Sequence, residues 1–577
     1  MTSKEQKNSQ TFIKGALILG IANFITKIIG AFFKVPLISL IGNEGSGYFN
    51  VAYQIYTFMF IVATAGFPVA ISKMVSESEA KNSYNDAKKV FRVAFMFLFV
   101  VGIVGTLILL LLSDKLAVLV GIPDASMGIA VIAPAIFFVA MSSAYRGYFQ
   151  GKQDMYPTAF SEVVESAGKM IIGLVMAAFF MKMSIDGSIG KAIDFAAGKI
   201  SDAHTQTIFS STGAIFGVTA GTFLASCLLT VIYIVKKRKR EKAGDIPRGN
   251  RDILLSLIKI AIPITIGASV SSLTTLIDMG TICRRLVVRP EVFEKYAFMF
   301  SEGSEFFAQA LEGGWDAATT LTHKATTLYG MYTGKALTMF NLPLTLIVAL
   351  GTSVVPAISS AVARKNSIEA RGITESTLRI AMLFAAPCAF GMAVLSKEIL
   401  NLLFGTYDAA SVLSILSFAI IPVAIVQVTN SILQAYGRVY VPVVNMIIGG
   451  AVKVLVNFFC IPYLGIDGAP VGTGVCYLII AILNIRAIIK TSGVKINWID
   501  FIVRPLVAAL IMGAVGYILS TFIPVGRFMC IVEIGICVVA YAVAVLFIVK
   551  ALRREDVLTL PKGDKIANIL DKFNVLR

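Results

Sequence analysis

The chain contains 577 residues, of which 57% are hydrophobic and only 15% are charged. A soluble globular protein has about 25% charged residues, so this composition excludes a soluble fold and indicates a polytopic membrane protein. Because its apolar runs are long enough for spanning helices rather than barrel strands, the net charge of +17 indicates basic cytoplasmic loops and not a nucleic-acid partner.

Apolar runs of about 20 residues predict an all-α polytopic membrane protein with about fourteen transmembrane helices. In chain order, their expected limits are 12–37, 47–72, 91–112, 128–149, 158–183, 211–235, 253–283, 327–360, 376–396, 409–433, 441–463, 468–489, 501–523 and 526–549. The first run follows polar residues without a cleavage signal, so we expect it to remain as a membrane anchor.

Lysine and arginine clusters predict the orientation of these helices. With fourteen crossings, every strongly basic segment falls on one side, which we expect to be the cytoplasm, together with both termini. These segments are marked by Lys4, Lys7 and Lys14, by Lys81, Lys88, Lys89 and Arg92, by Lys236 to Arg240, by Arg364, Lys365 and Arg371, and by Arg553, Arg554, Lys562 and Lys565. The loops 184–210 and 288–326 face the other side, and an amphipathic surface helix is expected in the second.

The sequence repeats in two halves. Pro68 to Ser72 ends the second span and has a counterpart in Pro356 to Ser359 at the end of the eighth, and Gly213-Ala214 has a counterpart in Gly468-Ala469. Six spans per half make a parallel repeat, which predicts two six-helix lobes rocking around a central cleft. The expected division is an N-terminal lobe over 1–236, a basic linker over 237–252, a C-terminal lobe over 253–490, an extra helix pair over 491–550 and a cytoplasmic tail over 551–577.

No enzyme signature is present, so we expect a transporter without a cofactor. The chain has no Gly-x-x-x-x-Gly-Lys-Ser/Thr phosphate loop, which argues against ATP as its fuel. Its two histidines, His204 and His323, are expected in loops, and no Cys-x-x-Cys pair occurs, so no metal site is predicted. The seven cysteines are interpreted as small apolar packing residues.

Lys27 and Lys34 are the first candidates for function, because a cation near the bilayer centre costs about 3 kcal/mol and rarely faces lipid. They are seven residues apart, so their ammonium groups share one helix face. This indicates a wet internal cavity that attracts anions. In the alternative interpretation, both side chains snorkel to the membrane interfaces.

Other ionisable residues also lie in apolar runs. The remaining candidates for substrate binding are Arg146, Lys169, Asp278, Lys335 and Lys453. Glu165 and Asp278 are candidates for ion pairing or for coupling to an ion. Glu165 precedes Lys169 by four residues, a spacing that also fits a structural pair within one helix. Cations outnumber acids in this set, which favours an anionic substrate such as a phosphate or diphosphate.

Four stretches carry a family resemblance: Ile25 to Gly30, Gly66 to Lys73, Tyr145 to Gly151 and Met155 to Thr158. They resemble polysaccharide-transport proteins, and more specifically the MurJ and stage V sporulation protein B group of lipid-linked oligosaccharide flippases. The resemblance covers nearly all of the chain. It implies a two-lobed fourteen-helix fold of the superfamily that includes multidrug exporters, and a role in peptidoglycan synthesis, cell shape or sporulation at the bacterial cytoplasmic membrane.

The resemblance implies that this chain flips an undecaprenyl-diphosphate-linked sugar, above all the peptidoglycan precursor lipid II. It implies that Lys27 and Lys34 face the cavity and meet the diphosphate, although many members have arginine there and lysine lacks its bidentate geometry. Asp278 matches an acidic position of the group, and the last two spans resemble its lipid-tail groove. The expected partners are the lipid-linked substrate, membrane lipids and enzymes of cell-wall synthesis, with no nucleic acid.

Three alternatives remain open. The first is a flippase for another lipid-linked glycan, such as a capsule or teichoic-type unit. The second is a cation-coupled multidrug exporter of the same superfamily, which would depend on Asp278 and Glu165. The third is a membrane scaffold for wall-synthesis enzymes that transports nothing.

Overall fold

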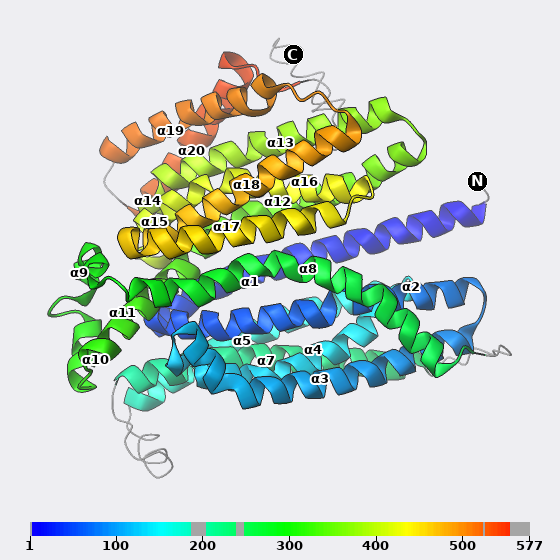
Figure 1. Ribbon diagram of the computed structural model, residues 1–577, viewed down its shortest axis with the longest axis horizontal. Coiled ribbons are helices and arrows are strands. Elements are labelled where there is room, and N and C mark those ends of the chain that lie inside the picture. Colours follow the sequence, from blue (N-terminus) through cyan, green and yellow to red (C-terminus); the bar gives the residue numbers. More distant parts are fainter. Residues whose placement is uncertain (1–2, 186–202, 238–246, 523–525, 554–577) are drawn as a thin grey trace. The chain divides into compact units, whose positions relative to one another are not determined.

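In a computed structural model, helices make up nearly all of the described part of the chain (Figure 1). The structure describes residues 3–185, 203–237, 247–522 and 526–553. The chain divides into two compact units. Unit 1 comprises Met1–Arg284 and Phe293–Gly330, and unit 2 comprises Arg285–Val292 and Met331–Arg577.

Unit 1 contains the helices of the first half of the chain and several short ones. They are α1 (Ser3–Thr64), α2 (Phe67–Ala80), α3 (Tyr84–Val120), η1 (Pro123–Ala125), α4 (Ser126–Gly151), α5 (Tyr156–Ile185), α7 (Ala203–Lys237), α8 (Asn250–Leu286, to Arg284), η2 (Pro290–Tyr296, from Phe293), α9 (Ala297–Phe300), α10 (Glu305–Glu312) and α11 (Ala317–Met331, to Gly330). Because α8 groups with unit 1, this division differs from the repeat-based boundary at 237–252, which stays a prediction.

The long helix α1 is broken at Gly42, whose backbone has φ 68° and ψ −174°. Glycine reaches this conformation without the clash that a Cβ atom would cause. The first and second predicted spans therefore lie on the two parts of α1, and α2 continues the second.

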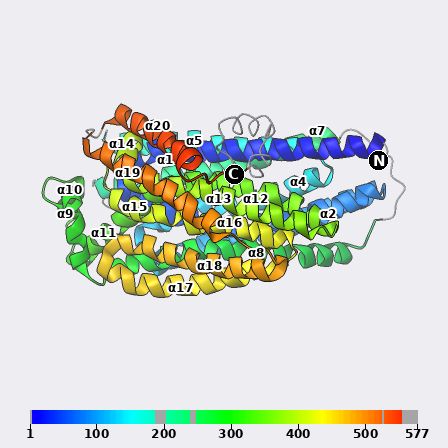
Figure 2. The same ribbon diagram turned by 90° about the horizontal axis from the view of Figure 1, so that it is seen from above.

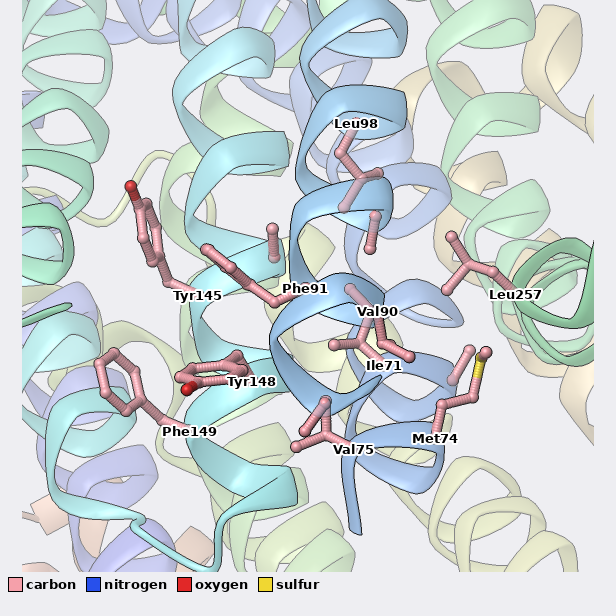
Figure 3. Close-up of a cluster of buried hydrophobic side chains, with 14 of the residues drawn as sticks. Ile71, Met74, Val75, Val90, Phe91, Leu98, Tyr145, Tyr148, Phe149 and Leu257 are labelled. Atoms are coloured by element: carbon pink, nitrogen blue, oxygen red, sulfur yellow. The ribbon is translucent and has the colours of Figure 1, made fainter. Parts of the chain in front are cut away.

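The core of unit 1 joins five helices, α2, α3, α4, α7 and α8. Figure 3 shows Phe91 of α3 beside Tyr145 and Tyr148 of α4, with ring centres 5.4 and 4.9 Å apart. Ile71 of α2 and Leu257 of α8 belong to the same buried cluster. Next to this core, α5 and α7 pack through glycines, so their backbones approach closely in the way that small residues allow in membrane helices.

Unit 2 contains the remaining helices. They are η3 (Tyr332–Ala336), α12 (Leu337–Ala363), α13 (Ser367–Val394), α14 (Ser396–Phe404), α15 (Ala410–Phe418), α16 (Ile420–Ala435), α17 (Tyr440–Leu464), η4 (Gly465–Asp467), α18 (Gly468–Ser492), η5 (Ile499–Val503), α19 (Arg504–Phe522), α20 (Arg527–Val543) and η6 (Ala544–Ile548). Figure 2 shows α17 beside α18. The predicted extra pair, α19 and α20, packs together, and α19 also packs on α13.

The all-α polytopic fold is confirmed, since each predicted span lies on a helix or a run of helices. Within the described ranges, ten helices are long and apolar enough to cross a membrane, or eleven if the bent pair α15 and α16 forms one span. Ile18–Ala80 has 63 residues and contains the Gly42 break, and Tyr440–Ser492 has 53 residues and contains η4. These two are long enough for two crossings each. The number of fourteen stays a prediction.

The structure also bears on the predictions for the two long loops and for the cysteines. The loop expected over 288–326 holds the short helices η2, α9 and α10 and the start of α11, and α10 buries Phe306 while exposing Leu311. All seven cysteines are free thiols. Of the loop expected over 184–210, residues 186–202 lie outside the described residues, and α7 begins at Ala203, before the predicted start of the sixth span.

Candidate functional site

Two lysines from different helices of unit 1 lie against one group of aromatic rings. Lys34 of α1 donates to Asn50 Oδ1 at 2.6 Å, and its Nζ lies 5.7 Å from the ring centre of Phe49. Lys169 of α5 places its Nζ 3.8 Å from the ring centre of Tyr53. We define the cationic cluster as Phe33, Lys34, Phe49, Asn50, Tyr53 and Lys169.

The break in α1 assembles this cluster from both parts of one helix. Phe33 and Lys34 precede Gly42, whereas Phe49 and Tyr53 follow it. Phe49 and Tyr53 are four residues apart on one helix face, and their rings stack with centres 5.7 Å apart.

Asn50 holds its acceptor toward Lys34. Its Nδ2 donates to Ser46 O at 2.7 Å and to Ser46 Oγ at 3.0 Å. With the amide nitrogen engaged there, Oδ1 is the atom that accepts from the Lys34 ammonium group. The lysine is therefore oriented by a neutral partner, which leaves its positive charge uncompensated.

The charge of the cationic cluster is unbalanced. In the part of the chain that the structure describes, neither Lys34 nor Lys169 forms an ion pair, and the two ammonium groups repel each other electrostatically. Both side chains are half-buried. Aromatic faces stabilise a cation only in part, whereas a bound anion would relieve the repulsion and satisfy both charges. The geometry is therefore suited to holding a doubly charged anionic group.

Lys27 lies two turns before Lys34 on α1, and its side chain is exposed. The contacts that define the cationic cluster come from Lys34 and Lys169 and do not involve Lys27. A role for Lys27 in substrate binding stays a prediction.

Arg146 and Glu165 form an ion pair between α4 and α5. Arg146 Nη2 donates to Glu165 Oε2 at 2.8 Å, and Arg146 Nε donates to Ser161 Oγ at 3.1 Å. The spacing of Glu165 and Lys169 also fitted a pair within one helix, but the structure pairs Glu165 with Arg146 on another helix, while Lys169 contacts the aromatic rings.

The sequence interpretation missed Glu162, one turn before Glu165 on α5. Glu162 is half-buried, and among the described residues its buried Oε2 has no hydrogen-bond partner. Arg146, Glu162 and Glu165 together, which we call the acidic group, contain two carboxyl groups and one cation. Such a group is able to take up a proton or a small cation. The available signal was a second glutamate at three-residue spacing within an apolar run.

The remaining predicted residues are Asp278, Lys335 and Lys453. In unit 1, Asp278 of α8 is buried and interacts electrostatically with Tyr329, whose hydroxyl donates to Gln54 Oε1 at 3.2 Å. In unit 2, Lys453 of α17 is buried. Lys335 of η3, also in unit 2, is discussed next because its partners are defined.

Lys335 is a buried lysine with a saturated ammonium group. Its Nζ lies 2.8 and 2.7 Å from the two carboxylate oxygens of Asp408 and 2.8 Å from Thr406 Oγ1. The three N–H groups of the ammonium thus have three acceptor oxygens, and the Asp408 carboxylate neutralises the positive charge of Lys335 inside unit 2. The geometry favours a structural role for Lys335.

The prediction that both histidines lie in loops is wrong. His204 lies in the first turn of α7, and His323 lies on α11. Their ring centres are 4.4 Å apart in unit 1, close to Glu44 of α1. No local sequence pattern indicated this group, because three separate helices bring its members together.

Comparisons with known proteins give a consistent assignment. The family described as "Polysaccharide biosynthesis protein" matches residues 12–362, and the family described as "Lipid II flippase MurJ" matches residues 318–535. Stage V sporulation protein B of Bacillus subtilis (strain 168) is 23% identical over 493 residues, which is 85% of each chain. Lipid II flippase MurJ of the same organism is 23% identical over 525 residues, covering 88% of this chain and 87% of the relative.

Two solved structures show the same fold. Lipid II flippase MurJ in an inward closed conformation superposes with a TM-score of 0.64 at 16% identity, covering 92% of this chain and 98% of that one. An inward-facing multidrug resistance MATE family transporter of the MOP superfamily gives a TM-score of 0.61 at 13% identity, covering 81% and 95%. Flippases and drug transporters thus share this architecture, and the fold alone does not distinguish between them.

Proposed function

This chain belongs to the polysaccharide biosynthesis protein family, and from that premise we propose that it is a flippase for an undecaprenyl-diphosphate-linked cell-wall precursor, with lipid II as the expected cargo. The match to the lipid II flippase family over 318–535 and the two full-length relatives support the flippase class. The expected location is the bacterial cytoplasmic membrane, with both termini in the cytoplasm.

The cationic cluster is the observation that carries this proposal. A diphosphate has two adjacent anionic groups, and Lys34 and Lys169 offer two ammonium groups that no acid in the described chain neutralises. Each ammonium donates strong charge-assisted hydrogen bonds to phosphate oxygens without the fixed geometry of arginine. A mobile point charge suits a carrier, since the headgroup must be released after it has crossed.

We propose the following path for the rest of the substrate. The sugar and diphosphate pass through a cationic cleft by alternating access of the two predicted lobes, while the lipid tail stays in the bilayer and follows α19 and α20. Lys27, two turns from Lys34 on α1, extends the cationic path. The acidic group on α4 and α5 is the candidate for coupling to an ion gradient, because this chain has no ATP-binding loop.

Complementation tests the role of the cationic cluster. In a strain that depends on this protein, Lys34→Ala and Lys169→Ala are expected to abolish growth, and Lys34→Arg is expected to preserve it because it keeps the charge. Lys73→Ala is the matched control, since Lys73 is an exposed cation on α2. Full growth with both alanine variants at normal protein levels would show that Lys34 and Lys169 are not needed to bind the diphosphate.

The cargo requires a separate experiment. Expression in a strain depleted of its own lipid II flippase is expected to restore growth and cell shape. Translocation of labelled lipid II in vesicles containing the purified protein is the direct measurement. Failure in both, with success for a capsule or teichoic-type precursor, would assign another lipid-linked glycan.

A cation-coupled multidrug exporter is the second candidate, and the acidic group favours it. The unsatisfied Glu162 oxygen lies beside the Arg146–Glu165 pair, as expected for a site that exchanges a proton for a cationic drug. This candidate predicts resistance to cationic dyes that Glu162→Gln abolishes. Unchanged dye sensitivity on overexpression would exclude it.

A further inference from the structure

We propose that Glu44, His204 and His323 form a binding site for a transition metal ion, with Zn²⁺ as the expected occupant. One carboxylate oxygen and one ring nitrogen from each histidine lie within 4.8 Å of one another. Two imidazoles and one carboxylate are a ligand set that zinc uses in proteins. All three residues belong to unit 1, and none of them is a member of the cationic cluster.

The spacing of the donor atoms fits a small tetrahedral ion. His323 Nδ1 lies 2.8 Å and His204 Nδ1 lies 3.5 Å from Glu44 Oε1. Ligand atoms bound to zinc at about 2.0–2.1 Å are about 3.3 Å apart in a tetrahedron. These two separations lie on either side of that value, and all three donor atoms lie within 4.8 Å of one another, so side-chain rotations would place them around one ion.

One donor atom is buried and unsatisfied. In the described chain, the buried His204 Nδ1 makes no hydrogen bond of standard geometry, and Glu44 Oε1 lies 3.5 Å away. A buried nitrogen of this kind costs free energy unless something binds to it. A metal ion would use its lone pair and would also bring the Glu44 oxygen and the His323 nitrogen to a common partner.

Asp124 supports the same assignment from the other side of the ring. Its Oδ2 lies 3.6 Å from His204 Nε2 and 4.0 Å from His323 Nδ1. A carboxylate facing the far nitrogen of a metal-bound histidine favours a proton there, which leaves the near nitrogen available to the metal. Asp124 therefore acts either as this orienting group or as a fourth ligand.

The surroundings exclude water from most of the site. The side chains of Glu44, His204 and His323 are 8%, 12% and 5% exposed. Trp315 stacks on His323 with ring centres 4.0 Å apart, and Tyr48 donates to Glu44 Oε1 at 2.5 Å. Such an apolar and hydrogen-bonded shell raises metal affinity by fixing the ligands.

The ion would join three separate parts of unit 1. Glu44 follows the Gly42 break in α1, His204 starts α7, and His323 lies on α11 shortly before unit 1 ends at Gly330. Binding to the folded state alone stabilises a protein, so zinc is expected to raise the unfolding temperature of the chain.

Trp315 gives an optical test. The chain has two tryptophans, so Trp498→Phe leaves Trp315 as the single reporter. The full-length protein is purified in detergent through a tag without histidines, treated with a chelator and then titrated. We expect one Zn²⁺ per chain by calorimetry, a rise in unfolding temperature, and quenching of Trp315 by Cu²⁺ that Zn²⁺ competes away.

Variants locate the site. Glu44→Gln, His204→Gln and His323→Gln are each expected to weaken zinc binding by about tenfold or more, and Asp124→Asn by about tenfold. Glu312→Gln is the matched control, because it removes an exposed acid of α10 near Trp315. Size exclusion and unfolding in chelator check that each variant is folded.

Either of two results overturns the proposal. One is the absence of zinc binding by the wild-type chain at micromolar concentration. The other is equal binding by the wild-type chain and by the His204→Gln/His323→Gln double variant, which would assign the ion to other surface groups.

Discussion

Arg146 on α4 and Glu165 on α5 form an ion pair with Nη2 and Oε2 2.8 Å apart, and their side chains are 9% and 20% exposed. Removing one partner of a largely buried pair leaves the other charge uncompensated. We therefore expect Arg146→Met to lower the free energy of unfolding by about 3 kcal/mol or more, and the Arg146→Met/Glu165→Gln double variant to recover part of that loss. Thermal unfolding in detergent measures both changes.

The control for this prediction is the exposed pair Lys73–Glu77, with N and O 4.0 Å apart. Lys73→Met is expected to cost less than about 1 kcal/mol, because water screens such pairs. Equal losses for Arg146→Met and Lys73→Met would mean that the α4–α5 pair contributes no more to the free energy of unfolding than an exposed pair does.

Lys335 is expected to matter for stability more than for transport. Asp408→Asn removes the carboxylate charge that faces the buried Lys335 ammonium and is expected to cost about 3 kcal/mol. The Lys335→Met/Asp408→Leu double variant removes both charges, so it should fold at least as well as Asp408→Asn and retain transport. A double variant that is stable but does not transport would show that Lys335 takes part in substrate binding.

Gly217 on α7 is expected to tolerate no side chain. A Cβ atom there would lie 2.3 Å from Gly173 Cα and 2.9 Å from the Lys169 backbone oxygen, both on α5. Gly217→Ala must push the helices apart, at a cost of about 1–3 kcal/mol or more. Unfolding temperature and expression level measure the effect.

Gly535 on α20 is the matched control, because a Cβ atom added there meets nothing within 4 Å. Alanine favours a helix over glycine by about 1 kcal/mol, so Gly535→Ala should be neutral or slightly stabilising. If Gly217→Ala were equally harmless, the close approach of α5 and α7 would be incorrect.

A buried amide network in unit 2 is also expected to stabilise it. Asn484 accepts from Asn445 Nδ2 at 2.8 Å and donates to Thr429 Oγ1 at 3.0 Å and Asn430 Oδ1 at 2.8 Å. Asn484→Leu would strand these partners on α16 and α17, so we expect a loss of about 1–3 kcal/mol or more. An unfolding midpoint unchanged in denaturant would show that other groups satisfy the partners.

Much of the fold could be predicted because the bilayer restricts a spanning chain to helices of a defined length and composition. Hydropathy therefore located the long apolar helices, whereas short helices such as α14 (Ser396–Phe404) lie almost entirely outside the predicted spans. The break at Gly42 was harder to predict. Only this one residue between the first two apolar runs has a non-helical backbone, and the residues on both sides of it are helical.

The candidate site could be predicted only in part. Lys34 and Lys169 stand out because a charge in an apolar run is rare. Which partner each charge selects depends on how helices pack, and so Glu165 pairs with Arg146 across helices instead of with Lys169 four residues away. Glu44, His204 and His323 lie far apart in the chain on three separate helices, and sequence periodicity carries no information about contacts between helices.

The π-helical turn η3, from Tyr332 to Ala336, carries Lys335. Such a turn holds one residue more than an α-helical turn, so side chains after it are rotated by about 100° relative to an uninterrupted α-helix. A single-residue deletion in this turn would restore the ordinary helix and leave the following faces of α12 in place, whereas closing the turn to an α-helical turn without a deletion would redirect every following face, burying some of its polar surface and exposing some of its core. The length of this one turn thus sets the register of a whole helix.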